Sequence, residues 1–233
     1  MNNPLIFHCE NEEEFWRRAE EDLLLCIQEA FRKYGNCRLG LAGGSTPKKL
    51  YEKLAEASLP WEKITLIQLD ERYVPSDQSE SNLGMLRKAL LSRAPVPPGN
   101  IVCFDTSLPY ESAAEEMERK LNQLQSPSRP LLDCLVLGAG TDGHIASLFE
   151  GDNALVSQRL VSRAHAKGYP TPERLTLTLR AMENCPSALL LLKGTEKNAV
   201  LLALEGKSNE PPLTALKSLL KGTTLKVLAY LQN

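Results

Sequence analysis

The stretch that decides the fold is LLDCLVLGAGTDGHIASLF, which runs from Leu131 to Phe149. Its first seven residues are apolar except Asp133, a composition typical of a buried strand in a parallel sheet. Gly138, Gly140 and Gly143 then allow the backbone to turn sharply. Open α/β sheets bind ligands in crevices at the carboxyl ends of their strands, so we predict a functional site at this turn.

Two reactive side chains follow the same predicted strand. Asp142 brings a carboxylate close to His144, the kind of side chain that ordinarily titrates near neutral pH. This pair predicts acid/base chemistry. The alternative is that the glycines only turn the chain and that His144 begins a helix and bonds locally. Ser147 lacks the Gly-x-Ser-x-Gly elbow of a serine nucleophile, and we expect it to be a helix residue.

The glycine spacing also matches the dinucleotide-binding fingerprint Gly-x-Gly-x-x-Gly. That fingerprint requires an acidic residue roughly 20 positions further on, where it binds the ribose. Here the region reads SQRLVSR over residues 157–163 and contains no acid. The sequence therefore does not predict a nucleotide site.

The overall composition is typical of a globular protein. The 233 residues are 42% hydrophobic and 24% charged, with a net charge of −2, so we expect one domain over residues 1–233 and no nucleic-acid surface. No apolar run approaches the roughly 18 residues of a membrane span. The opening MNNPLIFHCENEEEF lacks the regions of a secretion signal, which predicts a cytoplasmic protein without membrane contact. The oligomeric state stays open.

The cysteines form no metal or disulfide pattern. No CxxC pair is present, and we expect free buried thiols at Cys9, Cys26, Cys37, Cys103, Cys134 and Cys185. The three histidines are far apart in the sequence, whereas a zinc site needs clustered ligands. We therefore expect neither a metal nor a cofactor.

Strand and helix patterns alternate along the chain. A helix is predicted from Asn11 to Tyr34, with Asn11 as its cap, Glu14 completing a capping box and Gly35 ending it. Strands are expected at residues 38–42, 64–69, 101–104, 131–137, 174–179, 188–192 and 225–231. Further helices are expected at residues 47–57, 83–93, 109–124 and 196–205. This order predicts a three-layer α/β/α sandwich with a mostly parallel, Rossmann-like sheet.

A second glycine-rich turn lies in LGLAGGSTPKKLYEKLA, residues 39–55. We predict a strand, then a loop, then a helix with Pro47 at its first position. The loop residues Gly43, Gly44, Ser45 and Thr46 are candidates for binding a small phosphate ester at the helix N-terminus. Walker spacing is absent. The alternative is that Thr46 only caps the helix.

Charged residues follow another apolar strand directly. Asp70, Glu71 and Arg72 come after ITLIQL, at the strand end that faces the same crevice. A surface salt bridge among the three is the alternative interpretation. Arg174 and Lys197 are further cations that a bound phosphate would attract, or else solvated charges.

Taken together, these segments resemble the 6-phosphogluconolactonases of the wider glucosamine-6-phosphate isomerase/deaminase superfamily. The resemblance covers nearly the whole chain and rests on LAGGSTPKKLY, LDERYVPSDQSESNLG, LGAGTDGHIASLF, RLTLTL and GTEKNAV, in the order of that family. It implies a sugar-phosphate site. The loop from Gly43 to Thr46, with Arg72, Arg174 and Lys197, would hold the phosphate. Asp70, Asp142 and His144 would surround the reacting end.

One departure separates the branches of the superfamily. Deaminases carry a glutamate five residues after the corresponding histidine, where this chain has Phe149. Glu150 is one position later, which on a helix displaces it by about 100°. Glu150 also replaces a proline that often follows SLF in the lactonases. The lactonase branch is favoured.

The resemblance implies hydrolysis of 6-phospho-D-glucono-1,5-lactone in the oxidative pentose phosphate pathway, with His144 as the general base. The alternatives are a deaminase or aldose-ketose isomerase with Asp70 as its base, and a non-catalytic sugar-phosphate sensor. Residues 75–83 and 164–172 are candidate lids because they flank the proposed site.

Overall fold

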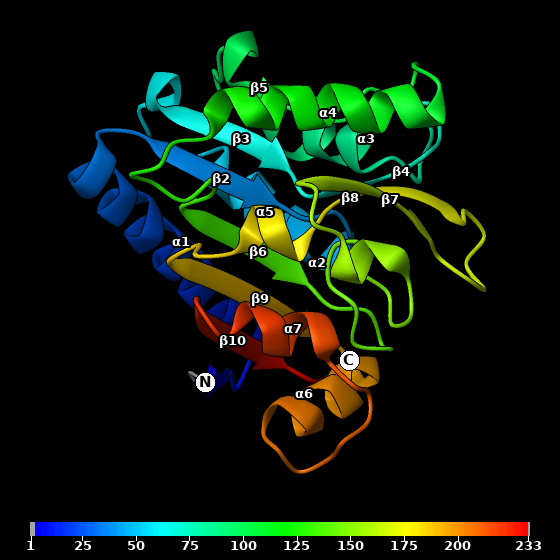
Figure 1. Cartoon of the computed structure of the whole chain (residues 1–233). Coiled ribbons are helices and arrows are strands. Elements are labelled where there is room, and N and C mark those ends of the chain that lie inside the picture. Colours follow the sequence, from blue (N-terminus) through cyan, green and yellow to red (C-terminus); the bar gives the residue numbers. More distant parts are fainter. Residues whose placement is uncertain (1–2, 233) are drawn as a thin grey trace.

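The computed structural model describes residues 3–232, and a sheet of seven strands runs through its centre (Figure 1). Neighbouring strands in this sheet are parallel at every pairing. In spatial order the strands are β1 (Leu5–His8), β10 (Thr224–Tyr230), β9 (Ser187–Lys193), β6 (Cys134–Gly138), β2 (Cys37–Leu41), β3 (Ile64–Gln68) and β5 (Ile101–Val102). The inner strands are short apolar runs because helices cover both of their faces.

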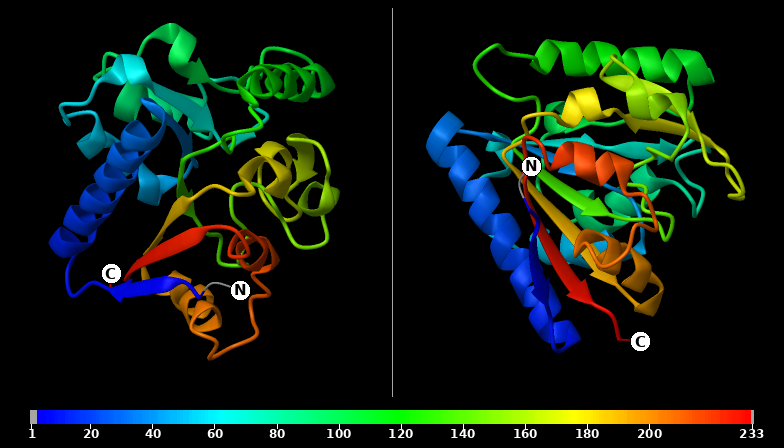
Figure 2. Two further views of the ribbon diagram at one scale, coloured as in Figure 1. Left: turned by 60° about the vertical axis from the view of Figure 1, so that its left-hand side comes forward. Right: turned by 60° about the horizontal axis from the view of Figure 1, so that its bottom comes forward.

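Helices form the two outer layers (Figure 2). One face packs against α1 (Glu12–Tyr34), α2 (Ser45–Leu54) and α3 (Asn82–Leu86), which a π-helical turn at Arg87–Leu91 continues. The other face packs against α4 (Tyr110–Leu124), α5 (Leu179–Met182), α6 (Asn198–Leu204) and α7 (Thr214–Leu219). Short 3₁₀ turns lie at Trp61–Lys63, Pro98–Asn100, Asn153–Val156 and Thr195–Lys197. The predicted three-layer α/β/α sandwich is confirmed.

The longest helix follows its sequence signals closely. Asn11 accepts a hydrogen bond from the backbone N–H of Glu14, at 2.9 Å, which satisfies one free donor of the first turn. Gly35 ends α1 in the left-handed region, with φ of 73°. The buried side chains of α1 repeat at helical spacing and press against the sheet. The predicted caps Asn11 and Gly35 are confirmed, but the predicted capping box is wrong: the Glu14 carboxylate accepts from the N–H of Glu10, at 2.8 Å, rather than from that of Asn11.

A second, antiparallel sheet lies beside the carboxyl ends of the central strands. Its order is β4 (Asp70–Arg72), β8 (Glu173–Leu177) and β7 (Val161–His165). Only β8 was predicted. β4 continues from β3 after a single residue, Leu69, whose carbonyl accepts a hydrogen bond from the N–H of Leu177, at 2.7 Å. The small sheet is therefore tied directly to the end of the large one.

Several predicted bounds are wrong. The helix expected at 47–57 begins at Ser45, so Pro47 is its third residue rather than its first. The loop expected at 164–172 starts only after His165, because residues 164 and 165 belong to β7. The helix expected at 196–205 is a 3₁₀ turn followed by α6. All six cysteines are free, but Cys26 and Cys103 are only partly buried.

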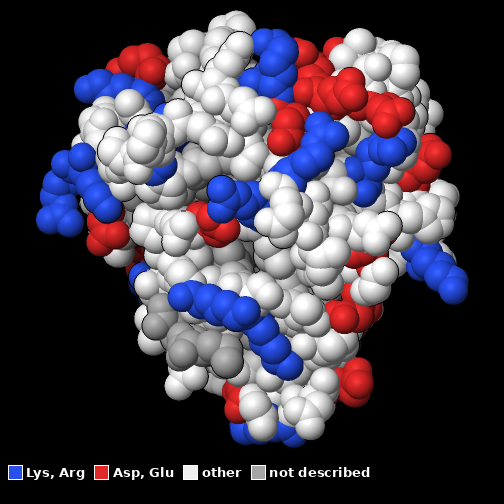
Figure 3. All heavy atoms as spheres, in the orientation of Figure 1, with Lys and Arg blue, Asp and Glu red and all other residues white. Residues whose placement is uncertain are grey.

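The described surface and helices carry two further observations. Lys and Arg side chains are mixed with Asp and Glu side chains over the face drawn in Figure 3, rather than forming one continuous basic area. Within residues 3–232, no helix has the length and apolar character needed to cross a membrane.

Candidate active site

A pocket of about 370 Å³ opens at the carboxyl ends of the central strands. Its walls come from the loop after β2, the loop after β6, and the start of β4. Of the predicted site residues, it is lined by Gly43, Gly44, Ser45, Thr46, Asp70, Arg72, His144 and Lys197. Asp142 and Arg174 adjoin this lining: Asp142 is hydrogen-bonded to His144, and Arg174 is paired in register with Arg72. The structure thus brings together residues that are more than 150 positions apart in the sequence.

The turn after β6 holds His144 against Asp142. The Nδ1 atom of His144 lies 2.5 Å from Oδ1 of Asp142. Gly140 closes the turn by donating its N–H to the His144 carbonyl, at 2.9 Å. A Cβ at Gly140 would lie 2.2 Å from the imidazole ring, so the close approach requires glycine. Nε2 of His144 has no hydrogen-bond partner among the described residues and is the ring nitrogen left for a ligand.

The electrostatics of this pair favour an ionised Asp142. Burial opposes the charge of the carboxylate, but hydrogen bonds from His144 and the attraction of its ring outweigh burial and lower the pKa of Asp142. The side chain of Asp142 is half exposed, while that of His144 is mostly covered. A negative charge is therefore fixed at Nδ1 of His144.

The segment after His144 is a turn, not the predicted helix. Ile145 forms isolated bridges with Ala139 and Leu148, and Ala146 has a φ of 48°. Ser147 is consequently no helix residue: it is buried, and its Oγ donates to Oδ2 of Asp70, at 2.8 Å. Glu150 lies in a turn, so the predicted helical displacement of about 100° from Phe149 is wrong.

Phe149 nevertheless occupies an informative position. Its ring lies on the imidazole of His144, with 4.4 Å between centroids. The position where deaminases carry a glutamate thus presents an aromatic face to the histidine, without any acid/base group.

Asp70 and Glu71 are buried, so the alternative of a surface salt bridge is wrong. Both carboxylate oxygens of Asp70 have donors: Ser147 Oγ at 2.8 Å and Asn82 Nδ2 at 3.2 Å. No ion pair joins Asp70, Glu71 and Arg72 in the described chain. Asp70 is a fixed acceptor at the pocket wall.

Glu71 organises the backbone next to the pocket. It is 1% exposed, and its carboxylate accepts five hydrogen bonds of 2.7 to 3.1 Å. The donors are the side chains of Gln68 and Ser81 and the backbone N–H groups of Arg72, Asn82 and Leu83. Burial raises the pKa of Glu71, and these hydrogen bonds act against that shift.

Asn82 is a pocket residue that the sequence argument missed. Glu71 fixes its backbone, and its side chain donates to the carbonyl of Asp70, at 3.0 Å. A Cβ on Gly43 would lie 2.0 Å from Cγ of Asn82, so Gly43 allows the two segments to touch. One local signal could have pointed to Asn82: Ser81 is a residue type that caps helices, so Asn82 would be the first helical residue. Ser81 does cap α3, accepting from the N–H of Gly84, at 3.0 Å.

Two arginines lie side by side on the small sheet. Arg72 of β4 is paired in register with Arg174 of β8. The Nε of each is buried without a hydrogen-bond partner in the described chain, and Nη1 of Arg72 donates to the Glu80 carbonyl, at 2.6 Å. Burial, and then the charge of Arg72, lower the pKa of Arg174, while Asp70 acts in the opposite direction. Two closely spaced, incompletely bonded guanidinium groups favour binding of an anion.

The segment from Gly43 to Thr46, whose last two residues begin α2, lines the same pocket as Arg72. Gly44 precedes α2 with a φ of 104°, and no side chain caps this helix, so the interpretation of Thr46 as a cap is wrong. The first N–H groups of α2 have no side-chain acceptor, an arrangement that favours an anion. Lys197 reaches the same pocket from the 3₁₀ turn after Gly194.

Tyr169 is the second missed pocket residue, although it lies in a segment flagged as a lid. Its ring is 38% exposed and lies 6.0 Å from the His144 ring and 5.8 Å from the guanidinium carbon of Arg174. Tyr169 thus connects the histidine with the arginines. Within residues 3–232, no cluster of three or more His, Cys, Asp or Glu side chains is arranged to hold a metal ion.

A parallel sheet with a polar pocket at its carboxyl edge is the architecture of α/β proteins that bind small ligands there. The chain belongs to the family of glucosamine-6-phosphate isomerases and 6-phosphogluconolactonases, whose family model matches residues 10–224.

Relatives with this similarity are named 6-phosphogluconolactonase. The protein of Thermotoga maritima is 42% identical over 157 residues, 67% of this chain and 69% of that protein. The protein of Homo sapiens is 38% identical over 185 residues, 76% of this chain and 71% of that protein. A crystal structure of the Thermotoga maritima 6-phosphogluconolactonase has a TM-score of 0.86 and 32% identity, covering 98% of this chain and all of the other.

Proposed function

We propose that this chain hydrolyses 6-phospho-D-glucono-1,5-lactone to 6-phospho-D-gluconate, a step of the oxidative pentose phosphate pathway. The observation that carries the proposal is one pocket that combines a carboxylate-supported histidine with paired arginines and an open helix N-terminus. The relatives named 6-phosphogluconolactonase support the same substrate. The span of the family match, residues 10–224, supports a single domain.

His144 is the proposed general base. Nε2 takes a proton from a water molecule while the water oxygen forms a bond to the lactone carbonyl carbon. The bond from that carbon to the ring oxygen then breaks, and Nε2 returns the proton to the ring oxygen. The fixed charge of Asp142 at Nδ1 stabilises the imidazolium between these two transfers.

The phosphate is proposed to bind between the N-terminus of α2 and the part of the pocket lined by Arg72 and Lys197. The Gly43 to Thr46 segment offers backbone N–H groups, and Arg72 offers its guanidinium. Lys197 adds a third donor from the opposite side. Arg174 lies beside Arg72 on the neighbouring strand and contributes charge. Asp70, held on both oxygens, favours the charged form of Arg174.

Two assays test this proposal against its alternatives. Purified protein is given freshly generated lactone, and acid release is followed above the spontaneous rate. The same protein is given glucosamine 6-phosphate, and ammonia is measured. Acid release without ammonia supports the lactonase. Ammonia release would establish the deaminase, and binding of sugar phosphates without either product would leave a sensor.

A further inference from the structure

A group of thiols lies at the amino end of the central sheet, the end opposite the active-site pocket. Cys37 begins β2 and Cys134 begins β6. Cys134 is paired in register with Leu39, two positions after Cys37, and with Ser187 on β9. Since alternate residues of a strand share a face, Cys37, Cys134 and Ser187 all point to the face that α1 covers.

Cys26 of α1 meets this face directly. Its Sγ lies 3.0 Å from Oγ of Ser187. Ser187 and Cys134 are neighbours on strands spaced about 4.8 Å apart. Ser187 therefore has Cys26 above it on the helix and Cys134 beside it on the neighbouring strand. Cys26 of the helix and Cys134 of the sheet thus adjoin the same serine side chain.

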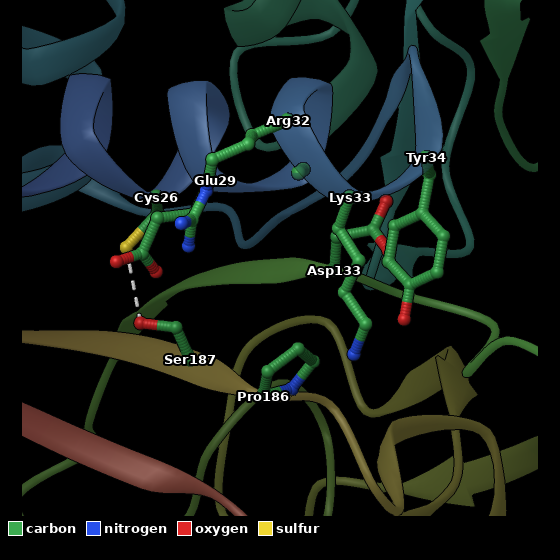
Figure 4. A pocket seen from close by; sticks show the side chains of 9 residues that line it. Cys26, Glu29, Arg32, Lys33, Tyr34, Asp133, Pro186 and Ser187 are labelled. Atoms are coloured by element: carbon green, nitrogen blue, oxygen red, sulfur yellow. Dashed lines mark hydrogen bonds between the residues drawn. The ribbon is translucent and has the colours of Figure 1, made fainter.

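Only one of these thiols is open to solvent. Cys26 lines a cavity of about 430 Å³ together with Arg32, Lys33, Tyr34 and Ser187 (Figure 4). Cys37 and Cys134 are buried behind it. A small polar reagent that enters the cavity therefore reaches Cys26 first.

Cys26 is the more acidic of the two thiols. Its neighbours Cys134, Ser187 and Lys226 lower the pKa of Cys26, against the effect of burial. The pKa of Cys134 is raised, both by its neighbouring thiols and by burial. Thiolates rather than thiols are nucleophiles, so the accessible sulfur is also the reactive one.

We propose that Cys26 is a site of reversible oxidation by hydroperoxides and that Cys134 is its resolving thiol. The Cys26 thiolate attacks one oxygen of the hydroperoxide: an S–O bond forms, the O–O bond breaks, and the other oxygen leaves as an alcohol or water after taking a proton. The sulfur of Cys134 then attacks the sulfenic sulfur of Cys26, forming the disulfide. The hydroxyl leaves with the proton of Cys134 as water. The two sulfurs lose two electrons, which the hydroperoxide gains.

A metal site is the other chemistry that clustered thiols suggest. No group of three or more ligating side chains within residues 3–232 has the geometry for it. The observed arrangement, one accessible sulfur backed by one buried sulfur, suits a two-step oxidation instead.

Alkylation tests the reactivity of Cys26, with Cys103 as the matched control. Cys103 is also partly buried, but burial raises its pKa from the ordinary value of 9.0. A larger fraction of Cys26 than of Cys103 is therefore thiolate near neutral pH, and Cys26 should be alkylated about fivefold faster or more. Iodoacetamide labelling followed by peptide mass spectrometry should show that difference. Equal rates would overturn the proposal.

Oxidation with hydrogen peroxide tests the pairing. Wild-type protein should lose about 2 Da and yield a linked peptide containing Cys26 and Cys134. Cys134→Ser should instead give a Cys26 sulfenic acid that dimedone traps, while Cys103→Ser should behave as wild type. Because the wild-type peptide map needs no variant, it decides even if Cys134→Ser fails to fold. A bond between Cys37 and Cys134, or none, would refute the assignment.

Discussion

Arg174→Met is expected to stabilise the protein while it weakens substrate binding. Arg174 is 6% exposed, and its buried Nε has no partner in the described chain. Burial and the neighbouring Arg72 both disfavour its charge, which is why its pKa is lowered. Methionine keeps a long apolar side chain over the same space and removes the guanidinium.

The structure sets the size of the stability effect. An unpaired buried donor costs about 1–3 kcal/mol, which the substitution recovers. The Arg174 guanidinium carbon lies 5.8 Å from the centroid of the Tyr169 ring, and losing this cation–π contact removes about 0.5–1 kcal/mol. The expected net gain of about 0–2.5 kcal/mol raises Tm by up to roughly 10 °C for a chain of this length.

Calorimetry and kinetics together test the prediction. Loss of a charged hydrogen bond to the phosphate, directly or through Arg72, should raise KM for the phosphorylated lactone about 10- to 150-fold. The ratio of kcat/KM for the phosphorylated lactone to kcat/KM for unphosphorylated gluconolactone should fall in parallel. Arg163→Met is the control, because Arg163 is an exposed arginine of β7 that pairs with Glu111 at 3.5 Å. A lower Tm with an unchanged substrate preference would show that Arg174 is purely structural.

Three other changes test the remaining parts of the site. His144→Ala should lower kcat by about 10²- to 10⁴-fold with little change in substrate binding, and near-normal turnover above spontaneous hydrolysis would exclude it as the base. Gly43→Ala should cost about 1–3 kcal/mol of stability and lower kcat/KM, because its Cβ would lie 2.0 Å from Asn82; urea unfolding and initial rates measure both. Asp142→Asn tests in which direction the stability of the protein changes with pH. The pKa of Asp142 is lowered from 3.8, so its stabilising contribution is present above about pH 4 and is lost as pH falls through its folded pKa. Unfolding curves of wild type and Asp142→Asn should therefore converge in acid, and a constant gap would contradict the pairing.

The elements that could be predicted are those with strong local signals. α1 carries a cap at each end and an apolar face between them. The inner strands are apolar runs bounded by turn residues. β4 could not be predicted, because it is three charged or polar residues that become a strand only by pairing with β8, about 100 positions later. β1 and β7 are likewise short and mixed in polarity.

The site residues likewise fall into those with a local sequence signal and those whose role depends on distant parts of the chain. Asp142 and His144 are two positions apart, so their contact was visible in the sequence. Ser147 was placed on a helix because nothing local shows that Ala146 adopts a positive φ. Asn82 was missed because its role comes from contact with Gly43 and Asp70, which only the folded chain brings together.

The division of the site between two sheets has a consequence for substrate size. In the proposed function the arginines that attract the phosphate belong to the small antiparallel sheet, whereas His144 follows β6 of the large one. The distance between the phosphate and the carbonyl of a substrate that fits is then determined by how the two sheets are joined. Leu69, the single residue between β3 and β4, makes that connection. Inserting or deleting residues at that junction would change the length of sugar phosphate that fits, while the arginines and His144 kept their own chemistry.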